Sequence, residues 1–196
     1  MDTLFYKIVR PIITFIFKIL FRPKIIGKEN IPKEGACVLA GNHTKWLDPF
    51  LLISSNKRQV HFLAKIELFK GITKPIMQWM GSISVNRKTH DKSALENAIN
   101  SLKKGLCIGI FPEGTINRTD DIILPFKIGA VKMSYEAPAT LVPFVITGKY
   151  KIFRKNICIK FLEPISVQGD LTLENDKLMK FISKELSEVR NDTKDK

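Results

Sequence analysis

Cysteine is scarce in this sequence. Only Cys37, Cys107 and Cys158 occur among 196 residues, and each lies in an apolar run. Their odd number and wide spacing exclude a disulfide framework and a CxxC zinc site. We interpret them as small buried hydrophobic residues in a protein from a reducing compartment.

Acidic residues are also few. The 19 Asp and Glu oppose 32 Lys and Arg, which gives a net charge of +13 and an isoelectric point near 9.7. Hydrophobic residues at 44% and charged residues at 26% are ordinary globular values, and they argue against a disordered, collagen-like or polytopic membrane protein. The basic charge suits nucleic acid or an anionic membrane surface, and composition alone does not choose between them.

Several chemistry-bearing motifs are missing. The sequence has no Walker loop, no GxGxxG loop and no GxSxG nucleophile elbow, so covalent serine catalysis on a hydrolase scaffold is unsupported. It also has no internal repeat, low-complexity stretch or interdomain linker. The length therefore predicts one domain.

The apolar segment 3–21 is interrupted by regularly spaced polar residues. At 100° per residue these residues fall on one helical stripe about 80° wide. The stripe consists of Thr3, Lys7, Arg10, Thr14 and Lys18. The apolar remainder includes the four phenylalanines Phe5, Phe15, Phe17 and Phe21.

This pattern favours a helix that lies in the membrane interface over one that crosses it. We expect these phenylalanines to enter an anionic membrane and Lys7, Arg10 and Lys18 to contact its headgroups. Pro11 should kink or divide the helix. No small-residue cleavage site follows, which argues against a signal peptide. The alternative is a helix that packs on the protein's own core.

The rest of the chain alternates short apolar runs with helical patterns, which is typical of an α/β domain. Strands are predicted at 24–27, 36–40, 60–64, 82–86, 106–111, 140–146 and 157–161, and helices at 92–104, 129–136 and 175–189. We expect a mixed central β-sheet flanked by helices. The predicted units are a membrane-associating segment 1–23, an α/β domain 24–190 and a frayed tail 191–196.

His43 and Asp48 follow directly on the predicted strand ACVLA. Loops at such strand ends bind ligands in α/β folds. If Asp48 accepts a hydrogen bond from one ring nitrogen of His43, the other nitrogen is free to act as a base. Alternatively, Asp48 is a simple helix N-cap and His43 a loop residue. The spacing alone leaves both interpretations open.

Two further loops carry polar residues after predicted strands. Arg87 follows SISVN and offers a fork of donors suited to phosphate, and Glu113 lies in the PEGT turn after LCIGIF. Either could be an ordinary solvated strand end. If the three loops share one edge of the sheet, they form a candidate site.

Taken together, these stretches resemble the glycerolipid acyltransferase family. NHTKWLD matches the family's NHxxxxD block, GSISVNR matches GxIxxxR, FPEGT is unchanged and VPFVI matches VPxxI. AKIEL and PFKIGA match as well, so the resemblance covers roughly residues 24–161. Four ordered blocks are far more specific than any one block, and they imply the glycerolipid acyltransferase fold.

The resemblance implies residue roles. His43 would be the general base and Asp48 its orienting partner. The implied substrate-binding residues, most of them near the acceptor's phosphate, are Asn42, Lys65, Arg87, Glu113, Gly114 and Thr115. Many relatives have Arg directly after FPEGT, where this chain has Ile116, so Arg118 or Lys127 is expected to supply that charge. Val142, Pro143 and Ile146 would support the site wall.

The implied reaction moves an acyl group from an acyl-CoA or acyl carrier protein thioester to the free hydroxyl of lysophosphatidate. No cofactor or metal is expected, and the partners would be an anionic phospholipid membrane, a lysophospholipid acceptor and the thioester donor. The expected location is peripheral or monotopic, at the cytoplasmic face of the cell membrane. Glycerol 3-phosphate or another lysolipid is an alternative acceptor.

Other classes fit the residues less well. A nucleic-acid binder should interleave aromatic and basic residues on one open face, but the basic stripe faces away from the phenylalanines, so no nucleic acid is expected. An intact His43 and Asp48 argue against a catalytically silent membrane adaptor. We interpret His61 and His90 as structural. The apolar residues Phe69, Ile72, Ile76, Met77 and Trp79 could line an acyl tunnel, but ordinary core is favoured.

Overall fold

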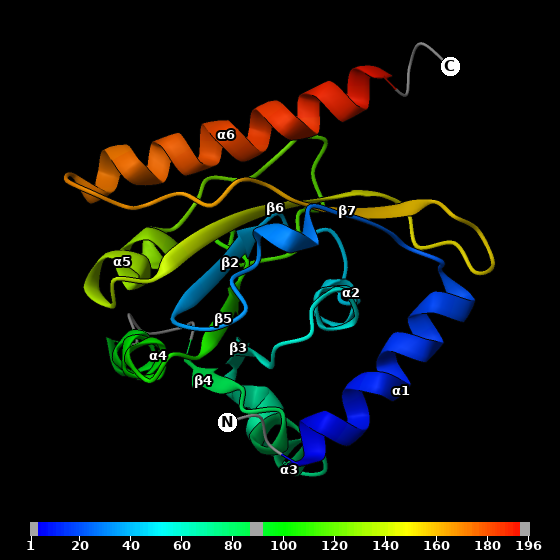
Figure 1. The fold of residues 1–196 in the computed structure, drawn as a ribbon, viewed down its shortest axis with the longest axis horizontal. Helices are drawn as coiled ribbons and strands as arrows, with labels where there is room; N and C mark the ends of the chain where they lie inside the picture. The colour runs from blue at the N-terminus through cyan, green and yellow to red at the C-terminus, as the bar shows by residue number, and fades with distance from the viewer. Residues whose placement is uncertain (1–3, 87–91, 193–196) are drawn as a thin grey trace.

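The computed structural model describes residues 4–86 and 92–192 as one mixed α/β fold (Figure 1). The helices are α1 (Leu4–Leu20), α2 (Asp48–Ser55), α3 (Thr73–Trp79), α4 (Lys92–Lys103), α5 (Gly129–Glu136) and α6 (Leu171–Asp192), with short 3-10 turns η1 (Lys28–Asn30) and η2 (Ile66–Phe69). The strands are β1 (Lys24–Ile26), β2 (Cys37–Gly41), β3 (Val60–Lys65), β4 (Ile83–Val85), β5 (Cys107–Ile110), β6 (Thr140–Gly148) and β7 (Ile157–Phe161).

The described strands form a seven-stranded sheet in the order β1-β7-β6-β2-β5-β3-β4. The neighbouring strands run parallel except for the β6–β7 pair, which is antiparallel. β2 lies at the centre and its residues are all buried. All seven strands predicted from the sequence are present, with ends shifted by at most two residues.

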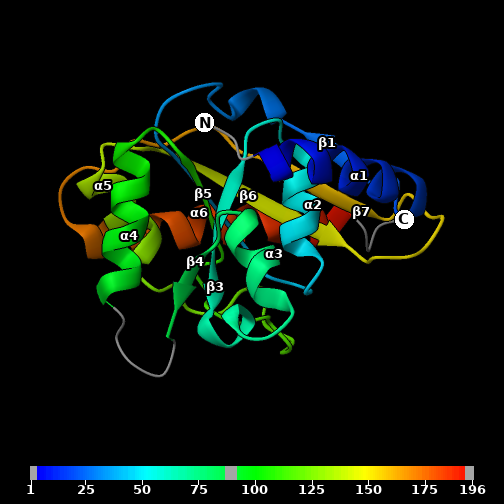
Figure 2. The same cartoon turned by 90° about the horizontal axis from the view of Figure 1, so that it is seen from below.

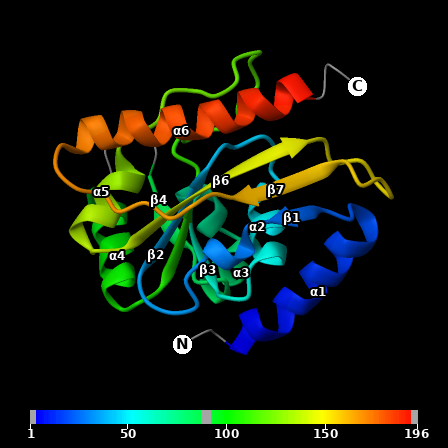
Figure 3. The same ribbon diagram turned by 45° about the horizontal axis from the view of Figure 1, so that its top comes forward.

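Two hydrophobic cores cover the two faces of the sheet. α1 and α2 pack on one face, and α4, α5 and α6 pack on the other. Figure 2 and Figure 3 show α6 separated from α1 by the sheet. Parallel strands covered on both faces bring their carboxyl ends to one edge, where loops from several strands meet.

Helix α6 begins earlier than the sequence predicts. Its first residue is Leu171 rather than Asn175, because the Asp170 carboxylate accepts hydrogen bonds from the backbone N–H groups of Thr172 and Leu173 at 2.7 and 3.1 Å. These donors have no partner within the helix, so the aspartate caps them.

Helix α1 is continuous through Pro11, so Pro11 does not divide it. Pro11 lies on the exposed side, where solvent can satisfy the carbonyl that loses its helical donor. No helix within the described residues is both long and apolar enough to span a bilayer.

The inward side of α1 corrects part of the predicted membrane contact. Phe17 and Phe21 are buried in the core, Phe5 packs against it, and the Arg10 Nε donates to the carbonyl of Asn56 at 2.6 Å. The Tyr6 hydroxyl donates to the carbonyl of Arg58 at 3.0 Å. These side chains hold α1 on the protein and are not available to a membrane.

A second side of α1 is apolar and exposed. It consists of Leu4, Ile8, Ile12, Phe15, Ile16 and Ile19, each between 43% and 75% exposed, and we call it the apolar face of α1. Lys7 and Lys18 lie exposed beside it. The helix therefore both packs on its own core and presents a separate hydrophobic surface, which the sequence interpretation treated as alternatives.

Candidate active site

The central strand β2 delivers His43 to the edge of the sheet. Gly41 ends this strand, and a Cβ there would lie 2.3 Å from the carbonyl oxygen of Phe144, so only glycine fits. The loop after it is fixed by its backbone, because the His43 N–H donates to Glu113 Oε1 at 2.7 Å and its carbonyl accepts from Asn117 N–H at 2.9 Å. The loops after β2 and β5 are thereby joined.

The predicted contact between His43 and Asp48 is present. The His43 Nδ1 lies 2.9 Å from Asp48 Oδ2, and Asp48 is completely buried. Asp48 is not a simple N-cap, because Leu47 holds that position and the carboxylate instead accepts from the backbone N–H groups of Thr44 and Lys45. These bonds fold the turn that the five-residue spacing requires.

The second oxygen of Asp48 has two hydroxyl donors. Asp48 Oδ1 accepts from Tyr150 at 2.7 Å and from Thr44 Oγ1 at 3.1 Å. Burial, followed by the nearby Asp48 charge, raises the pKa of Tyr150, so its hydroxyl stays protonated and donates. The Tyr150 ring packs edge-on against Phe17 of α1 and against Phe21, the residue that follows this helix, with centroids 6.5 and 5.5 Å away.

A groove opens in front of His43. Its ring stacks on Phe111 with centroids 4.1 Å apart, and it lines a cavity of about 460 Å³ between the strand ends and the helices α4 and α5. Three lysines, Lys92, Lys127 and Lys132, line the same cavity. Because Asp48 takes Nδ1, the histidine's Nε2 is the nitrogen left for a substrate in this groove.

Some of the expected substrate residues are at this cavity and others are not. Gly114 and Lys127 line it, and a Cβ on Gly114 would lie 3.0 Å from Lys127 Nζ. Lys65, Thr115 and Arg118 are exposed outside its lining. Arg87 and His90 lie outside the described residues.

The Asn42 and Glu113 side chains both bind backbone groups of other segments, and their expected substrate contacts stay predictions. The Asn42 side chain donates to the carbonyl of Ile146 at 2.9 Å and accepts from its N–H at 2.7 Å. Glu113 Oε2 accepts from Leu124 N–H at 2.9 Å, while its other oxygen holds His43. Both side chains are buried, and a carboxylate would also repel a phosphate.

Glu113 should make stability depend on pH. Burial raises the pKa of its carboxyl above the ordinary 4.5, although the His43 and Leu124 N–H groups oppose the shift. The folded state therefore holds the Glu113 proton more tightly than the unfolded state does, and the resulting stabilisation is lost as pH rises through the raised pKa. Thermal unfolding of the natural protein and of Glu113→Gln measures this effect. The Tm of the natural protein minus the Tm of the variant should fall as pH rises from about 4 towards neutrality. A pH-independent difference would contradict this.

His61 and the described side chains of α3 do not line the groove in front of His43. His61 Nδ1 lies 2.8 Å from the carbonyl of Gly81, consistent with a structural role. Ile72 and Ile76 are exposed and neither lines the groove, so they are not the ordinary core that we favoured.

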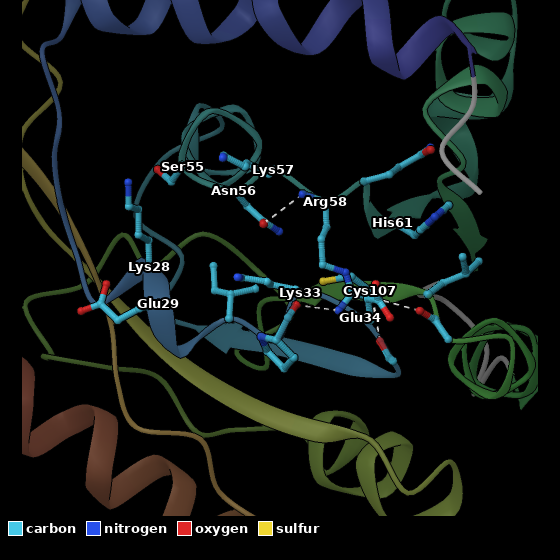
Figure 4. Close-up of a pocket in the computed structure, with 16 residues that line it drawn as sticks. Lys28, Glu29, Lys33, Glu34, Ser55, Asn56, Lys57, Arg58, His61 and Cys107 are labelled. Carbon is cyan, nitrogen blue, oxygen red and sulfur yellow. Dashed lines mark hydrogen bonds between the residues drawn. The ribbon is translucent and has the colours of Figure 1, made fainter.

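A larger cavity of about 950 Å³ lies at the opposite ends of the strands (Figure 4). The Arg58 guanidinium crosses it and donates to the carbonyls of Pro32, Gly35 and Gly105 at 2.9, 2.6 and 2.9 Å. Its donors are thus engaged with backbone. Arg58 ties together the loops that lead into β2 and β5, remote from His43.

Replacing Arg58 should therefore affect stability. Arg58→Met keeps the alkyl stem but leaves three carbonyls without their charged donor, and we expect a loss of about 2–4 kcal/mol in the free energy of unfolding. Lys57→Met, at the exposed neighbour, should change it by no more than about 0.5 kcal/mol. Urea unfolding measures both, and equal effects would contradict the assigned role.

Within the described residues, no group of three or more His, Cys, Asp or Glu side chains is arranged to hold a metal ion. The site's distinguishing groups are the His43–Asp48 pair, the Tyr150 hydroxyl and the lysines of the groove. This arrangement can accept a proton beside a bound anion.

Acyltransferases from other organisms are similar to this chain in sequence. The 1-acyl-sn-glycerol-3-phosphate acyltransferase of Borreliella burgdorferi is 35% identical over 136 residues, which cover 68% of this chain and 54% of that protein. The enzyme of the same name from Bacillus subtilis is 34% identical over 133 residues, covering 64% of this chain and 62% of that protein. The chain thus spans between half and two thirds of these relatives.

A solved structure shares the fold. The 1-acyl-sn-glycerophosphate (LPA) acyltransferase PlsC from Thermotoga maritima superposes with a TM-score of 0.74 at 21% identity, covering 94% of this chain and 81% of that one. The family model described as Acyltransferase matches residues 22–147, which include His43, Asp48 and Glu113. The chain belongs to this acyltransferase family.

Proposed function

We propose that this protein transfers a fatty acyl group from a thioester to the free sn-2 hydroxyl of lysophosphatidate, forming phosphatidate. The observation that carries the proposal is the buried Asp48 holding His43 at the mouth of a lysine-lined groove. The names of the relatives from Borreliella burgdorferi and Bacillus subtilis support the same acceptor.

The first step would use the free nitrogen of His43. With Nδ1 donating to Asp48, Nε2 removes the proton of the acceptor hydroxyl as its oxygen attacks the thioester carbonyl. Asp48 stabilises the imidazolium that forms. The carbon–sulfur bond then breaks, the thiolate leaves, and it receives the proton from His43.

The groove's cations would hold the acceptor's phosphate. Lys92, Lys127 and Lys132 line the cavity with His43, and exposed ammonium groups bind phosphate as point charges. The proposed donor is acyl-CoA or an acyl carrier protein thioester, and Arg87 remains a proposed phosphate contact. We also propose that the FPEGT loop positions the NHxxxxD loop, because the Glu113 carboxylate binds the backbone N–H of His43.

The apolar face of α1 would bring this site to an anionic membrane, at its cytoplasmic face. We expect Ile8→Gln/Phe15→Gln to weaken binding to anionic vesicles by at least about tenfold, because burying such side chains contributes roughly 1.5–3 kcal/mol each. Glutamine preserves helix propensity. Leu173→Gln, on an exposed residue of α6, is the control in the vesicle co-sedimentation assay. Equal binding by both variants would contradict the role of α1.

Product analysis tests the reaction itself. The purified protein is incubated with lysophosphatidate or glycerol 3-phosphate and with acyl-CoA or acyl carrier protein thioesters, and products are identified by mass spectrometry. We expect phosphatidate, with its formation dependent on lysophosphatidate. Lysophosphatidate made from glycerol 3-phosphate, without phosphatidate, would overturn the assigned acceptor, and free fatty acid as the only acyl product would overturn transfer.

A further inference from the structure

We propose that the loop between β6 and β7 is a second membrane contact, which binds anionic phospholipid independently of the active-site chemistry. We call residues 149–156 the β6–β7 tip. The inference adds to the proposed function, and it shares with that function only the premise that the protein works at a membrane.

The β6–β7 tip exposes two adjacent large apolar side chains. Ile152 is 62% exposed and Phe153 is 61% exposed. Exposed single hydrophobic residues are common on protein surfaces, but this pair lies at the end of a projecting loop with basic neighbours. These neighbours are Lys149, Lys151, Arg154 and Lys155, all exposed. An apolar pair among cations is complementary to lipid tails beneath anionic headgroups.

The backbone holds Phe153 in a conformation that a bulky residue rarely adopts. Its φ is +59°, in the left-handed region that glycine or asparagine occupies at lower cost. The Phe153 N–H donates to the carbonyl of Leu20, at the end of α1. Phe153 therefore adopts a costly backbone conformation although its exposed ring contributes little to the core.

The same hydrogen bond joins the β6–β7 tip to the last residue of α1. Figure 1 and Figure 3 both show the loop projecting beside the end of α1 that carries Ile16 and Ile19. The β6–β7 tip thus lies beside the end of α1, where Lys18 and Ile19 are exposed. One flat lipid surface can contact both, and two contacts fix orientation as well as attachment.

A matched pair of substitutions tests the apolar contribution. Phe153→Asn removes the ring while retaining a residue suited to the left-handed conformation, and Leu173→Asn removes a side chain that is 60% exposed on α6. Co-sedimentation uses vesicles of equimolar phosphatidylglycerol and phosphatidylcholine. We expect Phe153→Asn to weaken binding about tenfold and Leu173→Asn to leave it unchanged. Equal binding by the two variants, with both folded by circular dichroism, overturns the proposal.

The basic residues provide a second measurement. Lys151→Gln/Lys155→Gln should weaken binding to the same vesicles about fivefold per charge at low salt, with a smaller effect at high salt. Binding that is unchanged at low salt would show that the tip's cations do not face lipid. If the tip instead binds an acidic protein, both the apolar and the charge variants will bind vesicles normally.

Insertion can also be observed directly. In Phe153→Trp, brominated phospholipid should quench the added fluorescence over that of the parent protein, whereas Leu173→Trp should show no added quenching. Absence of added quenching at position 153 overturns membrane insertion. Because these assays measure binding, a protein that binds through the tip but makes no phosphatidate would contradict the proposed function and leave this proposal standing.

Discussion

His43→Ala should lower kcat for acyl transfer by at least about 10²–10⁴-fold, the contribution expected of a positioned general base. The ring lies on a loop and lines the groove, so its loss removes the proton acceptor without emptying a core position. The backbone bonds of this residue to Glu113 and Asn117 remain possible in alanine. Initial rates with lysophosphatidate and an acyl thioester, together with thermal unfolding, measure the two effects separately.

His61→Gln is the matched control. Like His43, His61 has a hydrogen-bonded Nδ1. The partner of His61 is the carbonyl of Gly81, and His61 does not line the groove. We expect His61→Gln to lower Tm and to leave kcat close to that of the natural protein. Near-normal turnover by folded His43→Ala would contradict the proposed mechanism.

Asp48→Asn should produce the second large effect. Asparagine offers one acceptor oxygen where the carboxylate accepts from five donors on His43, Thr44, Lys45 and Tyr150. Its amide would favour the wrong histidine tautomer and cannot stabilise an imidazolium, so we expect kcat to fall by roughly 10²–10⁴-fold. Unsatisfied buried donors should also cost about 1–3 kcal/mol of stability.

Tyr150→Phe tests the hydroxyl that holds the Asp48 carboxylate separately from the charge of that carboxylate. It removes one hydroxyl donor while leaving the Asp48 carboxylate and its bond to His43, so the loss of kcat should be much smaller than in Asp48→Asn. Initial rates of the two variants with lysophosphatidate and an acyl thioester measure the difference. If Asp48→Asn retains normal kcat, Asp48 does not orient the base.

The strands were predictable because each is a short apolar run that ends at a turn. The His43–Asp48 contact was predictable as a possibility, since Pro49 favours a turn before α2. The motifs did not show that Asn42 and Glu113 bind backbone groups of other segments. Both belong to the site's blocks, but their partners are backbone groups of distant segments.

Two features required tertiary information. Tyr150 is separated from Asp48 by 102 residues and belongs to no motif of the site. Helical periodicity found the polar stripe of α1, but it could not show that Phe17 faces the core while Phe15 faces outward. The side on which a helix docks depends on the surface it meets, which here includes the backbone of Asn56 and Arg58.

The Tyr150 side chain makes the docking of α1 and the geometry of the base two parts of one equilibrium. Its ring rests on Phe17 and Phe21, and its hydroxyl holds Asp48. Thermodynamic linkage is reciprocal, so the free energy by which docked α1 favours the ordered carboxylate equals the free energy by which the ordered carboxylate favours docked α1. We expect a ligand that orders Asp48 through His43 to slow amide hydrogen exchange in α1.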